Sequence, residues 1–463
     1  MTGLKIAFVP IDNRPVCYTL AQQIAEIDKN LELFLPPRDM LGDLTKTADI
    51  DGIIGWLQKL DKVDKIVVSL DTVAYGGLIP SRRSEDTFEQ IEERMKKFKS
   101  ILLQNSAKVY AFSSIMRISN NNINEEEKEY WNLYGTKIFQ YSYNVHKNAP
   151  ETQVETDVPL EILQDYLKTR KRNFDVNMMY LEWAKEGVFD TLVFSKDDCA
   201  QYGLNVAEAQ ALEQCIKENN LKALVKTGAD EIPLSLLCRA IAEGREIKIF
   251  PAFTQSGFVD RISKYEDVTV YDSVRGQIEL AGANIVNSEN EADIVLVINN
   301  FKEEQGELVM GVDVEGFAGK LELPEKPYII ADILNANGAD NNFVEQFLHS
   351  EINWDKFLGY AGWNTTGNTL GSVLCCAIVK YLAQSVDLEA FKKVQAVRFL
   401  DDWAYQANVR KKLKSVLKEP DTDRLKSEMQ NFETILGSKF KMDLKNTSYS
   451  YPWHRFFEVE VTL

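Results

Sequence analysis

Short runs of apolar and β-branched residues alternate with longer amphipathic stretches along almost the whole chain, and this alternation constrains the fold more than any other feature. Parallel strands that are joined by covering helices produce such a pattern. Helical segments are predicted over 84–105, where Ser84 and Glu85 open the first turn, and over 124–148 and 158–187. The predicted strands are 5–12, 31–37, 65–71, 108–114, 191–197, 223–230, 247–253, 293–299, 328–334 and 357–364.

The number of strands suggests how they are arranged. Ten exceed the eight of a (β/α)8 barrel, but 268–325 has the pattern of a small inserted α/β unit and 31–37 that of a peripheral strand. Without these, about eight strands remain, so we expect an α/β fold with a distorted TIM-like barrel over 1–385. A helical C-terminal region, 386–463, should follow, with its final strand packed on the barrel.

Charge and composition exclude several classes of protein. The chain of 463 residues has 53 Lys and Arg against 70 Asp and Glu, a net charge of −17, which argues against nucleic acid or an anionic membrane as partner. The only apolar run near the N-terminus, Ile6 to Val9, is followed at once by Asp12, unlike a signal peptide. With no run of about 18 apolar residues either, we expect a soluble cytoplasmic protein.

The cysteines and histidines give little support for a metal site. The six cysteines show no CxxC spacing and are expected to be reduced, mostly buried thiols. There are three histidines, and none follows a predicted strand, whereas zinc hydrolases generally use two or three His ligands. The leading interpretation therefore includes neither a metal nor another cofactor.

Polar clusters follow one predicted strand after another, and carboxyl ends of parallel strands are where α/β folds place their sites. We therefore expect these clusters to converge on one pocket that binds a small molecule or glycan. The clusters are PIDNRP, SLDTVAYGGLIPSRR, SSIMRIS, SKDDCAQYG, TGADEIP, ADILNANGAD and GYAGWNTTGN.

Asp197 and Asp198 in SKDDCAQYG are the predicted catalytic pair. Neighbouring residues of a strand point to opposite faces, so two adjacent acids share a site only where the strand ends. Two carboxyl groups held close together shift one pKa upward, which leaves one proton donor and one anion. The alternative is an N-cap for the next helix, although Tyr202 and Gly203 intervene.

Other charged and aromatic residues at strand ends are predicted substrate contacts, and two pairs of them also have a structural alternative. Asp230 and Glu231 also suit the N-terminus of a helix that has Pro233 in its first turn. Asp12 and Arg14 are equally well explained as a structural ion pair. Tyr75 is suited to stacking on a sugar or a base. The remaining members of this group are Asp71, Arg117 and Tyr202.

Amides and a tryptophan form the last predicted cluster. Asn and Asp beside a Trp face suit a neutral polyol, through paired hydrogen bonds and stacking of C–H groups on the ring. The alternative is that Asn and Gly simply build turns here. The predicted contacts are Asp332, Asn335, Trp363, Asn364 and Asn368.

The ordered set of motifs PIDNRP, SLDTVAYGGLIPSRR, MRIS, SKDDCAQYGLN, GADE, AGWNTTGNTLG and PWHRFFEV resembles a bacterial group, domain-of-unknown-function family 4127, over nearly the whole chain. A second resemblance, from Asp197 onward, is to the retaining β-N-acetylglucosaminidases of glycoside hydrolase family 84, which are TIM barrels. It implies that Asp197 orients a 2-acetamido group and Asp198 is the general acid. It also implies that Asp332 and Asn335 bind sugar hydroxyls and that Asn364 lies beside Trp363.

Three functions are consistent with these residues. The leading one is a carbohydrate-active, glycosidase-like hydrolase that uses the Asp197–Asp198 pair. The second resemblance implies that the oxygen of the sugar's own 2-acetamido group attacks the anomeric carbon. The second is a Mg²⁺- or Mn²⁺-dependent enzyme for a phosphorylated small molecule. The third is a non-catalytic sugar or metabolite sensor. The metal-dependent alternative uses the acids Asp12, Asp71, Asp198, Asp230 and Asp332, with Arg14, Arg82 and Arg117 holding the phosphate.

Overall fold

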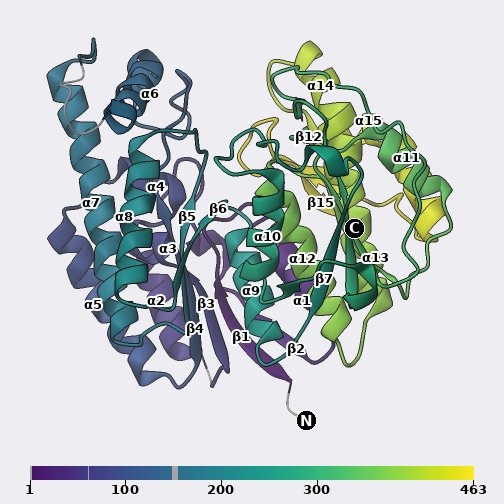
Figure 1. Ribbon diagram of the computed structural model, residues 1–463, viewed down its shortest axis with the longest axis horizontal. Coiled ribbons are helices and arrows are strands. Elements are labelled where there is room, and N and C mark those ends of the chain that lie inside the picture. The colour runs from purple at the N-terminus through teal and green to yellow at the C-terminus, as the bar shows by residue number, and fades with distance from the viewer. Residues whose placement is uncertain (1–2, 61, 149–154) are drawn as a thin grey trace.

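The computed structural model describes residues 3–60, 62–148 and 155–463, and its main chain forms two open parallel sheets side by side (Figure 1). The first sheet has the order β2-β1-β3-β4-β5-β6. Its strands are β1 Leu4–Val9, β2 Leu31–Phe34, β3 Lys65–Ser69, β4 Lys108–Ile115, β5 Thr191–Lys196 and β6 Ala223–Thr227.

The second sheet has the order β13-β11-β9-β7-β8 and is also parallel. Its strands are β7 Lys248–Phe253, β8 Asn284–Ile285, β9 Ile294–Asn299, β11 Tyr328–Asp332 and β13 Phe357–Ala361. All ten predicted strands are therefore confirmed, and β8 is the one that sequence analysis missed in this sheet.

The two sheets share one topology. In each sheet the strand that comes first in the sequence, β1 or β7, lies between the second and the third. The second, β2 or β8, is at the sheet edge, and the third, β3 or β9, is on the other side. This is the order of doubly wound, flavodoxin-like sheets, and it leaves both edges open. The α/β class with parallel strands is confirmed, but the expected barrel is not. The chain starts a second sheet at β7 instead of closing the first one at β6.

The segment 268–325, expected to be an insertion, is an integral part of the second sheet. It contributes β9, which pairs with β7 on one side and with β11 on the other. It also contributes α10 (Val270–Leu280), which packs against α12 (Thr366–Leu382). The short strand β10 (Gly306–Glu307) pairs with β12 (Asn335–Ala336) above the sheet.

A layer of helices lies between the two sheets and is shared by them (Figure 1). Within this layer α9 packs on β3 and β4, α12 packs on β11 and β13, and the two helices pack on each other. Parallel sheets are normally covered on both faces, and this layer covers one face of each. Its helices are α1 Thr19–Ala25, α9 Ile232–Ala242, α10 and α12.

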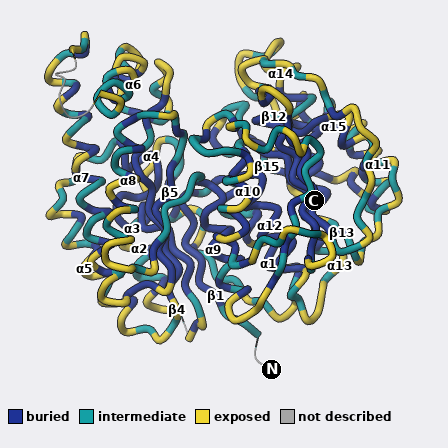
Figure 2. Tube along the Cα trace, in the orientation of Figure 1, coloured by how far each residue is buried: buried dark blue, intermediate teal, exposed yellow. Residues whose placement is uncertain are grey.

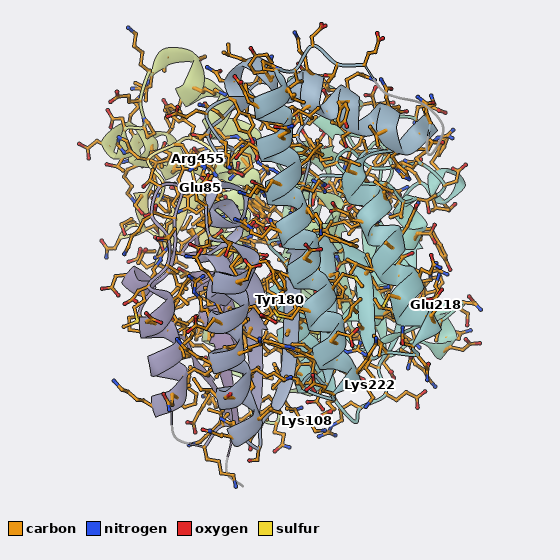
Figure 3. The ribbon with its side chains drawn as sticks, turned by 90° about the vertical axis from the view of Figure 1, so that its left-hand side faces the viewer. Glu85, Lys108, Tyr180, Glu218, Lys222 and Arg455 are labelled. Carbon is orange, nitrogen blue, oxygen red and sulfur yellow. The ribbon has the colours of Figure 1, made fainter. Side chains whose placement is uncertain are left out.

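The outer helices cover the remaining faces. Figure 3 looks at the outer layer of the first sheet, where Tyr180 of α7 is fully buried. That layer comprises α2 Ile50–Lys59, α3 Leu70–Tyr75, α5 Phe88–Gln104, α7 Leu160–Lys185 and α8 Leu204–Glu218, with α4 Leu78–Arg83 and α6 Trp131–Asn148 near the carboxyl edge. The second sheet is covered by α11 Asn341–His349, α13 Leu388–Arg398, the π-helix η4 Phe399–Val409, α14 Arg410–Val416 and α15 Thr422–Phe440.

Side-chain alternation along the strands explains the two cores of the first sheet. In β1, Ile6 and Phe8 face the shared helical layer, whereas Ala7 and Val9 face the outer helices. Residues of a strand alternate between its faces, and an apolar residue at every position is what a sheet buried on both sides requires. Figure 2 shows the strands as the buried centre of each half.

Two local expectations need correction. Helix α5 begins after Thr87, whose hydroxyl accepts a hydrogen bond from Gln90 N while Gln90 caps the Thr87 N–H, so Ser84 and Glu85 precede the helix. The final strand β15 (Glu460–Thr462) forms an antiparallel ribbon with β14 (Ser448–Ser450) instead of packing on a barrel. Within the described ranges, no helix combines the length and apolar character needed to cross a membrane.

The α9–α12 contact gives a test of the fold. A Cβ on Gly371 of α12 would lie 2.4 Å from Cγ of Glu231 and 2.8 Å from Oγ of Ser235 in α9. Gly371→Ala should therefore destabilise the protein by about 1–3 kcal/mol, because the two helices must separate to admit the methyl group. Urea denaturation measures this change.

Gly55→Ala in α2 is the matched control, because no atom lies within 4 Å of a Cβ added there. This substitution should stabilise the protein slightly, by roughly 0.4–1 kcal/mol, because alanine loses less backbone entropy on folding. Equal effects of the two substitutions would contradict the tight packing of α9 on α12.

Candidate active site between the two sheets

A cavity of about 220 Å³ lies between the carboxyl edges of the two sheets. The loops after β1, β4, β5 and β6 supply one side, and the loops after β7 and β13 supply the other. The C-terminal segment supplies Trp453 and Phe457. The sequence-predicted residues that line it are Arg14, Arg117, Asp197, Asp198, Asp230, Asn364 and Asn368.

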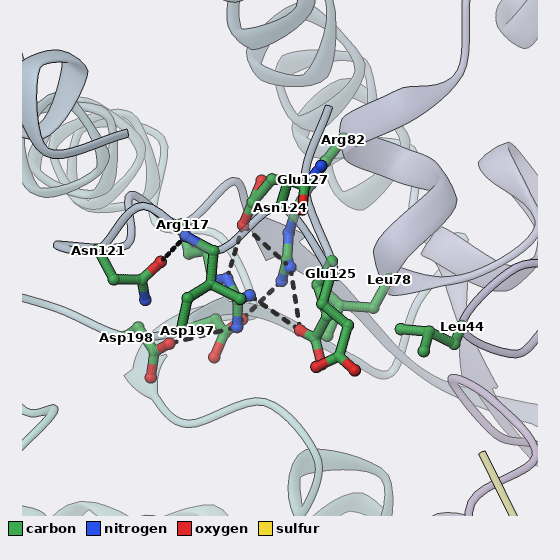
Figure 4. A network of polar contacts seen from close by, with 12 residues as sticks. Leu44, Leu78, Arg82, Arg117, Asn121, Asn124, Glu125, Glu127, Asp197 and Asp198 are labelled. Carbon is green, nitrogen blue, oxygen red and sulfur yellow. Dashed lines mark hydrogen bonds and ion pairs between the residues drawn. The ribbon is translucent and has the colours of Figure 1, made fainter. Parts of the chain in front are cut away.

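Asp197 is held by two arginines at the end of β5 (Figure 4). Its Oδ2 accepts a hydrogen bond of 2.8 Å from Nη2 of Arg82, which follows β3 on α4 and is almost completely buried. Arg117, in the loop after β4, approaches the same oxygen at 3.7 Å. With two guanidinium groups beside one oxygen, Asp197 has the stronger cationic contacts of the pair.

The same two arginines are balanced by acids on their other side. Arg117 pairs with Glu126 at 2.8 Å and with Glu127 at 3.0 Å, and Arg82 lies 3.4 Å from Glu127. The positive charges lower the pKa of Glu126 below its usual range, although burial opposes them. The arginines are therefore held by carboxylates of the protein itself.

Asp198 differs from its neighbour in environment. Its Oδ2 lies 3.2 Å from Nη1 of Arg117, and about 33% of its side chain is open to the cavity. Burial of the carboxyl group, followed by the negative charge of Asp197, raises the pKa of Asp198 to about 7, against the effect of Arg117 and Arg82. Asp198 is thus the carboxyl group of the pair that holds a proton near neutral pH.

The backbone at Asp198 has a left-handed conformation, with φ of 39°. An aspartate tolerates this region better than most residues, but it still costs free energy. The turn breaks the strand alternation and brings both neighbouring carboxyl groups to the cavity, as the sequence argument required.

Arg14 joins the first and the sixth strand at the cavity. Its guanidinium donates to Asp12 at 2.6 Å and to Asp230 at 2.5 Å, and it lies 4.8 Å from the centre of the Trp453 ring. Burial, the largest influence, raises the pKa of Asp230 to about 6 although Arg14 lowers it. The structural alternative for Asp12 and Arg14 is thus present, with Asp230 as an additional partner.

These residues also bear on the metal-dependent alternative. In the described part of the chain, Asp12, Cys17 and Asp230 are the group whose potential ligand atoms lie within 4.8 Å of one another. The Arg14 guanidinium binds both carboxylates, and burial keeps the pKa of Cys17 well above its usual range. A protonated thiol and two carboxylates bound to arginine do not fit a divalent cation.

The second sheet contributes a carboxyl group that sequence analysis missed. Glu266, in the loop after β7, lines the cavity and accepts a hydrogen bond of 2.8 Å from Gly367 N in the first turn of α12. Ser273 donates to its other oxygen. Burial raises the pKa of Glu266 to about 7, against these hydrogen bonds.

Contacts across the cavity connect the two sheets. Lys196 at the end of β5 pairs with Asp267 at 2.6 Å, and both side chains are buried. The backbone N–H of Cys199 donates to the carbonyl of Tyr265 at 3.2 Å. Both contacts lie next to Asp197 and Asp198, so the second sheet helps to fix the position of these two carboxyl groups.

The amide groups come from the loop after β13. Asn364 has φ of 58°, and its carbonyl accepts from Asn337 N at 2.8 Å. Asn368 lies in the first turn of α12, where its side-chain amide donates to Thr365 Oγ1 at 3.0 Å. Asn364, Thr365 and Asn368 therefore present a polar wall opposite Asp197.

The π-helix η4 fixes the loops on this side of the cavity. Gly362 N donates to Asp402 Oδ2 at 2.8 Å, and Ala339 N donates to the Asp402 carbonyl at 3.0 Å. Gln406 donates to Asp401 at 2.9 Å, five residues before it, which is the spacing that a π-helix brings into line. The helix thus binds the turns that precede Asn364 and follow Asn337.

Several predicted contacts lie away from the cavity, and their role as ligands remains a prediction. Asp71 accepts from Ser114 N at 2.8 Å, Tyr75 is buried among the outer helices, and Tyr202 packs edge-on against Tyr143. Asp332 accepts from Asn299 at 2.9 Å in the second sheet. The others are Asn335 in β12, Trp363 in the core, Glu231 beneath Glu266 at the N-terminus of α9, and Asp12 behind Arg14.

Sequence analysis missed how several residues shape the site, although it gave Arg82 a phosphate to hold in the metal-dependent alternative. Arg82 was visible in SLDTVAYGGLIPSRR, but its partner Asp197 is 115 residues away. Trp453 and Phe457 belong to PWHRFFEV, a motif that contributed only to the family resemblance. Glu126, Tyr265 and Glu266 follow strands by several residues, so their position did not mark them.

A family model for proteins of unknown function, DUF4127, matches residues 6–462, which is essentially the entire chain. The chain belongs to the DUF4127 family. This confirms the first resemblance, whereas the likeness to family 84 glycosidases remains a prediction. No curated protein matches the chain.

The buried carboxyl groups predict how stability depends on pH. Burial raises the pKa of Glu231 and Asp332 to about 8 and that of Asp71 to about 7. The folded state thus retains protons that the unfolded state has lost, so their stabilising contribution is complete below pH 4 and disappears as pH rises through 7–8. Urea midpoints should fall between pH 5 and pH 9, with a slope of up to about 1.4 kcal/mol per pH unit for each group.

Glu231→Gln should flatten this slope, because glutamine does not titrate. Glu243, which Lys108 and Lys65 stabilise as an anion, has a pKa lowered to about 2 and does not titrate in this window. Glu243→Gln is therefore the control and should leave the slope unchanged. Stability that rises from pH 5 to pH 9 would contradict burial of these groups as protonated acids.

Proposed function

We propose that this protein is a glycosidase-like hydrolase of small neutral polyhydroxylated substrates and that Asp198 is its general acid. The observation that carries the proposal is the pair at the end of β5. Asp198, with its pKa raised to about 7, adjoins Asp197, which Arg82 keeps ionised in the same cavity. A proton donor beside a fixed anion is the arrangement that glycoside hydrolysis uses.

The charges around the cavity favour a neutral ligand. Arg14, Arg117 and Lys196 line it, and each is paired with a carboxylate at 2.5–2.8 Å. A phosphorylated ligand would have to displace these acids, and it would also meet Asp197 and Glu126. Hydroxyl groups, in contrast, can donate to carboxylates and amides without displacing a cation.

The size of the cavity supports a small substrate. Its volume of about 220 Å³ is below the roughly 300 Å³ at which pockets for drug-sized ligands begin. Carboxyl groups and the amides of Asn364 and Asn368 line it together with Tyr265 and Phe457. One sugar unit, with polar edges and apolar faces, suits such a mixed lining.

The proposed reaction assigns a separate role to each acid. Asp198 donates its proton to the leaving oxygen as the bond from that oxygen to the anomeric carbon breaks, and Arg117 at 3.2 Å stabilises the anion that remains. Asp197 stabilises the positive charge at the sugar, or orients a 2-acetamido group that attacks the anomeric carbon. Water then completes hydrolysis and returns a proton to Asp198.

A ligand sensor is the second candidate, because the cavity lies between two doubly wound units. Proteins of this architecture often bind a small molecule by closing two domains on it. The discriminating variant is Asp198→Asn. If the protein is a sensor, Asp198→Asn leaves ligand binding intact. The wild-type protein then turns over no substrate.

Turnover of nitrophenyl glycosides, with 2-acetamido sugars included, tests the proposal directly. We expect the wild-type protein to hydrolyse at least one substrate. Asp198→Asn should lower kcat about 10²–10⁴-fold, because the proton donor is gone. Asp260→Asn, an exposed acid in the loop after β7, is the control and should retain full activity. Activity that survives in Asp198→Asn would contradict the assigned acid.

The pH profile tests the same assignment independently. A general acid must be protonated, so kcat/KM should decrease as pH rises through about 7. Arg117 lowers the pKa of Asp198, and Arg117→Gln should therefore shift this alkaline limb to higher pH. A limb that stays in place in Arg117→Gln would exclude Asp198 as its origin.

A further inference from the structure

A short hairpin at the mouth of the cavity carries exposed apolar side chains. After strand β10 the chain reverses direction near Gly311, which has φ of 72°. Glu307 at the end of β10 then forms an antiparallel bridge with Val312. At the tip, Val309 is 40% exposed and Met310 is 75% exposed. Val309 also lines the cavity, so the apolar tip is continuous with the candidate site.

The hairpin tip (residues 308–311) is held in place from below. The buried carboxylate of Glu307 accepts the backbone N–H groups of Val309, at 3.3 Å, and of Met310. The side-chain amide of Asn337, which lines the cavity, donates to the same carboxylate. The outward direction of Val309 and Met310 therefore follows from a fixed turn and a buried acid.

Tyr265 connects the hairpin with Asp198. Its loop contacts the hairpin base, where Lys264 N donates to Gln305 at 2.8 Å, and its own carbonyl accepts from Cys199 N, next to Asp198. Burial, Glu307 and Asp198 together raise the pKa of the Tyr265 phenol above its usual value. Tyr265 is 37% exposed and lines the cavity together with Asp198 and Val309.

The cavity has both buried and exposed lining. Asp197, Asp230 and Asn368 are buried or half-buried, as are the apolar Leu78 and Ile79. Tyr265 and Val309 are exposed lining, and Met310 follows Val309 at the tip. These few side chains are far too small a surface for a stable protein partner, which needs about 800 Å² on each side. An apolar part of the small molecule in the cavity matches both the size and the position.

We infer that the hairpin tip and Tyr265 bind an apolar leaving group, so that the substrates are glycosides of alkyl or aryl alcohols. The inference rests on the proposed function, because Asp198 protonates the leaving oxygen and the leaving group must therefore lie on the Asp198 side. Tyr265 and Val309 line the same cavity as Asp198 and are themselves exposed, so they lie at its rim. The sugar then occupies the rest of the cavity, beside Asp197 and the amides of Asn364 and Asn368.

Binding of an alkyl series tests the inference. The probes are methyl, butyl and hexyl glycosides of whichever sugar the protein hydrolyses, measured by calorimetry. Burial of two methylene groups on the tip should lower the Kd of the hexyl compound about tenfold relative to the methyl compound. The double variant Val309→Ser/Met310→Ser should reduce this ratio to below about threefold. Ile123→Ser, an equally simple change of an exposed residue on the first unit, should preserve it.

A second probe separates this inference from the proposed function. N-phenyl-1-naphthylamine, which carries no sugar, should fluoresce on binding to the wild-type protein and to Ile123→Ser but weakly with the double variant. If the probe binds in this pattern but no glycoside is hydrolysed, the proposed function is refuted and the apolar subsite is supported. If hydrolysis occurs but Kd is independent of chain length, or if the double variant binds the probe like the wild-type protein, the apolar subsite is refuted.

Discussion

The packing of α9 against α12 is the contact on which the rest of the structure depends. Each helix covers its own sheet, and Gly371 lets them approach until Glu231 and Ser235 fill the space beside it. Two open parallel sheets that share one helical layer bury their faces with fewer helices than two separate units would need. Because the shared layer sets both sheets side by side, their carboxyl edges meet at one cavity.

The cavity is defined by how its charges are balanced. The three buried cations at the cavity, Arg14, Arg82 and Lys196, would be costly alone. Each has a carboxylate partner from a distant part of the chain, as Arg82 has Asp197 and Arg14 has Asp230. This balance leaves the site without a free cation among the described lining residues. It also leaves Asp198 with a single, longer contact to Arg117, so burial is the main influence that raises its pKa, as the proposed general acid requires.

The sequence predicted the strands well because hydrophobic runs and alternation are local properties. It could not predict how the strands pair. In parallel sheets the crossover helices bring distant strands together, and nothing in β6 or β7 marks the end of one sheet and the start of another. Counting strands therefore favoured one barrel over two sheets, and β9, a central strand, was assigned to an insertion.

The site was predictable to the extent that it follows strand ends. Asp197, Asp198 and Asp230 reached the cavity because carboxyl ends of parallel strands share an edge. Asp332 also ends a parallel strand, but it does not line the cavity. It lies in the second sheet and accepts a hydrogen bond from Asn299. Trp453 could not be placed, because its position depends on how the C-terminal segment crosses the finished fold.

The proposed mechanism depends on Asp198 keeping a proton near neutral pH in the cavity between the sheets. The most direct measurement is a carbon-13 NMR titration of the aspartate carboxyl carbons, with Asp198→Asn to assign the signal. We expect a midpoint near 7 for Asp198. A midpoint near 3.9, the value of an unperturbed aspartate, would show that Asp198 is an ordinary anion and would contradict its role as the acid.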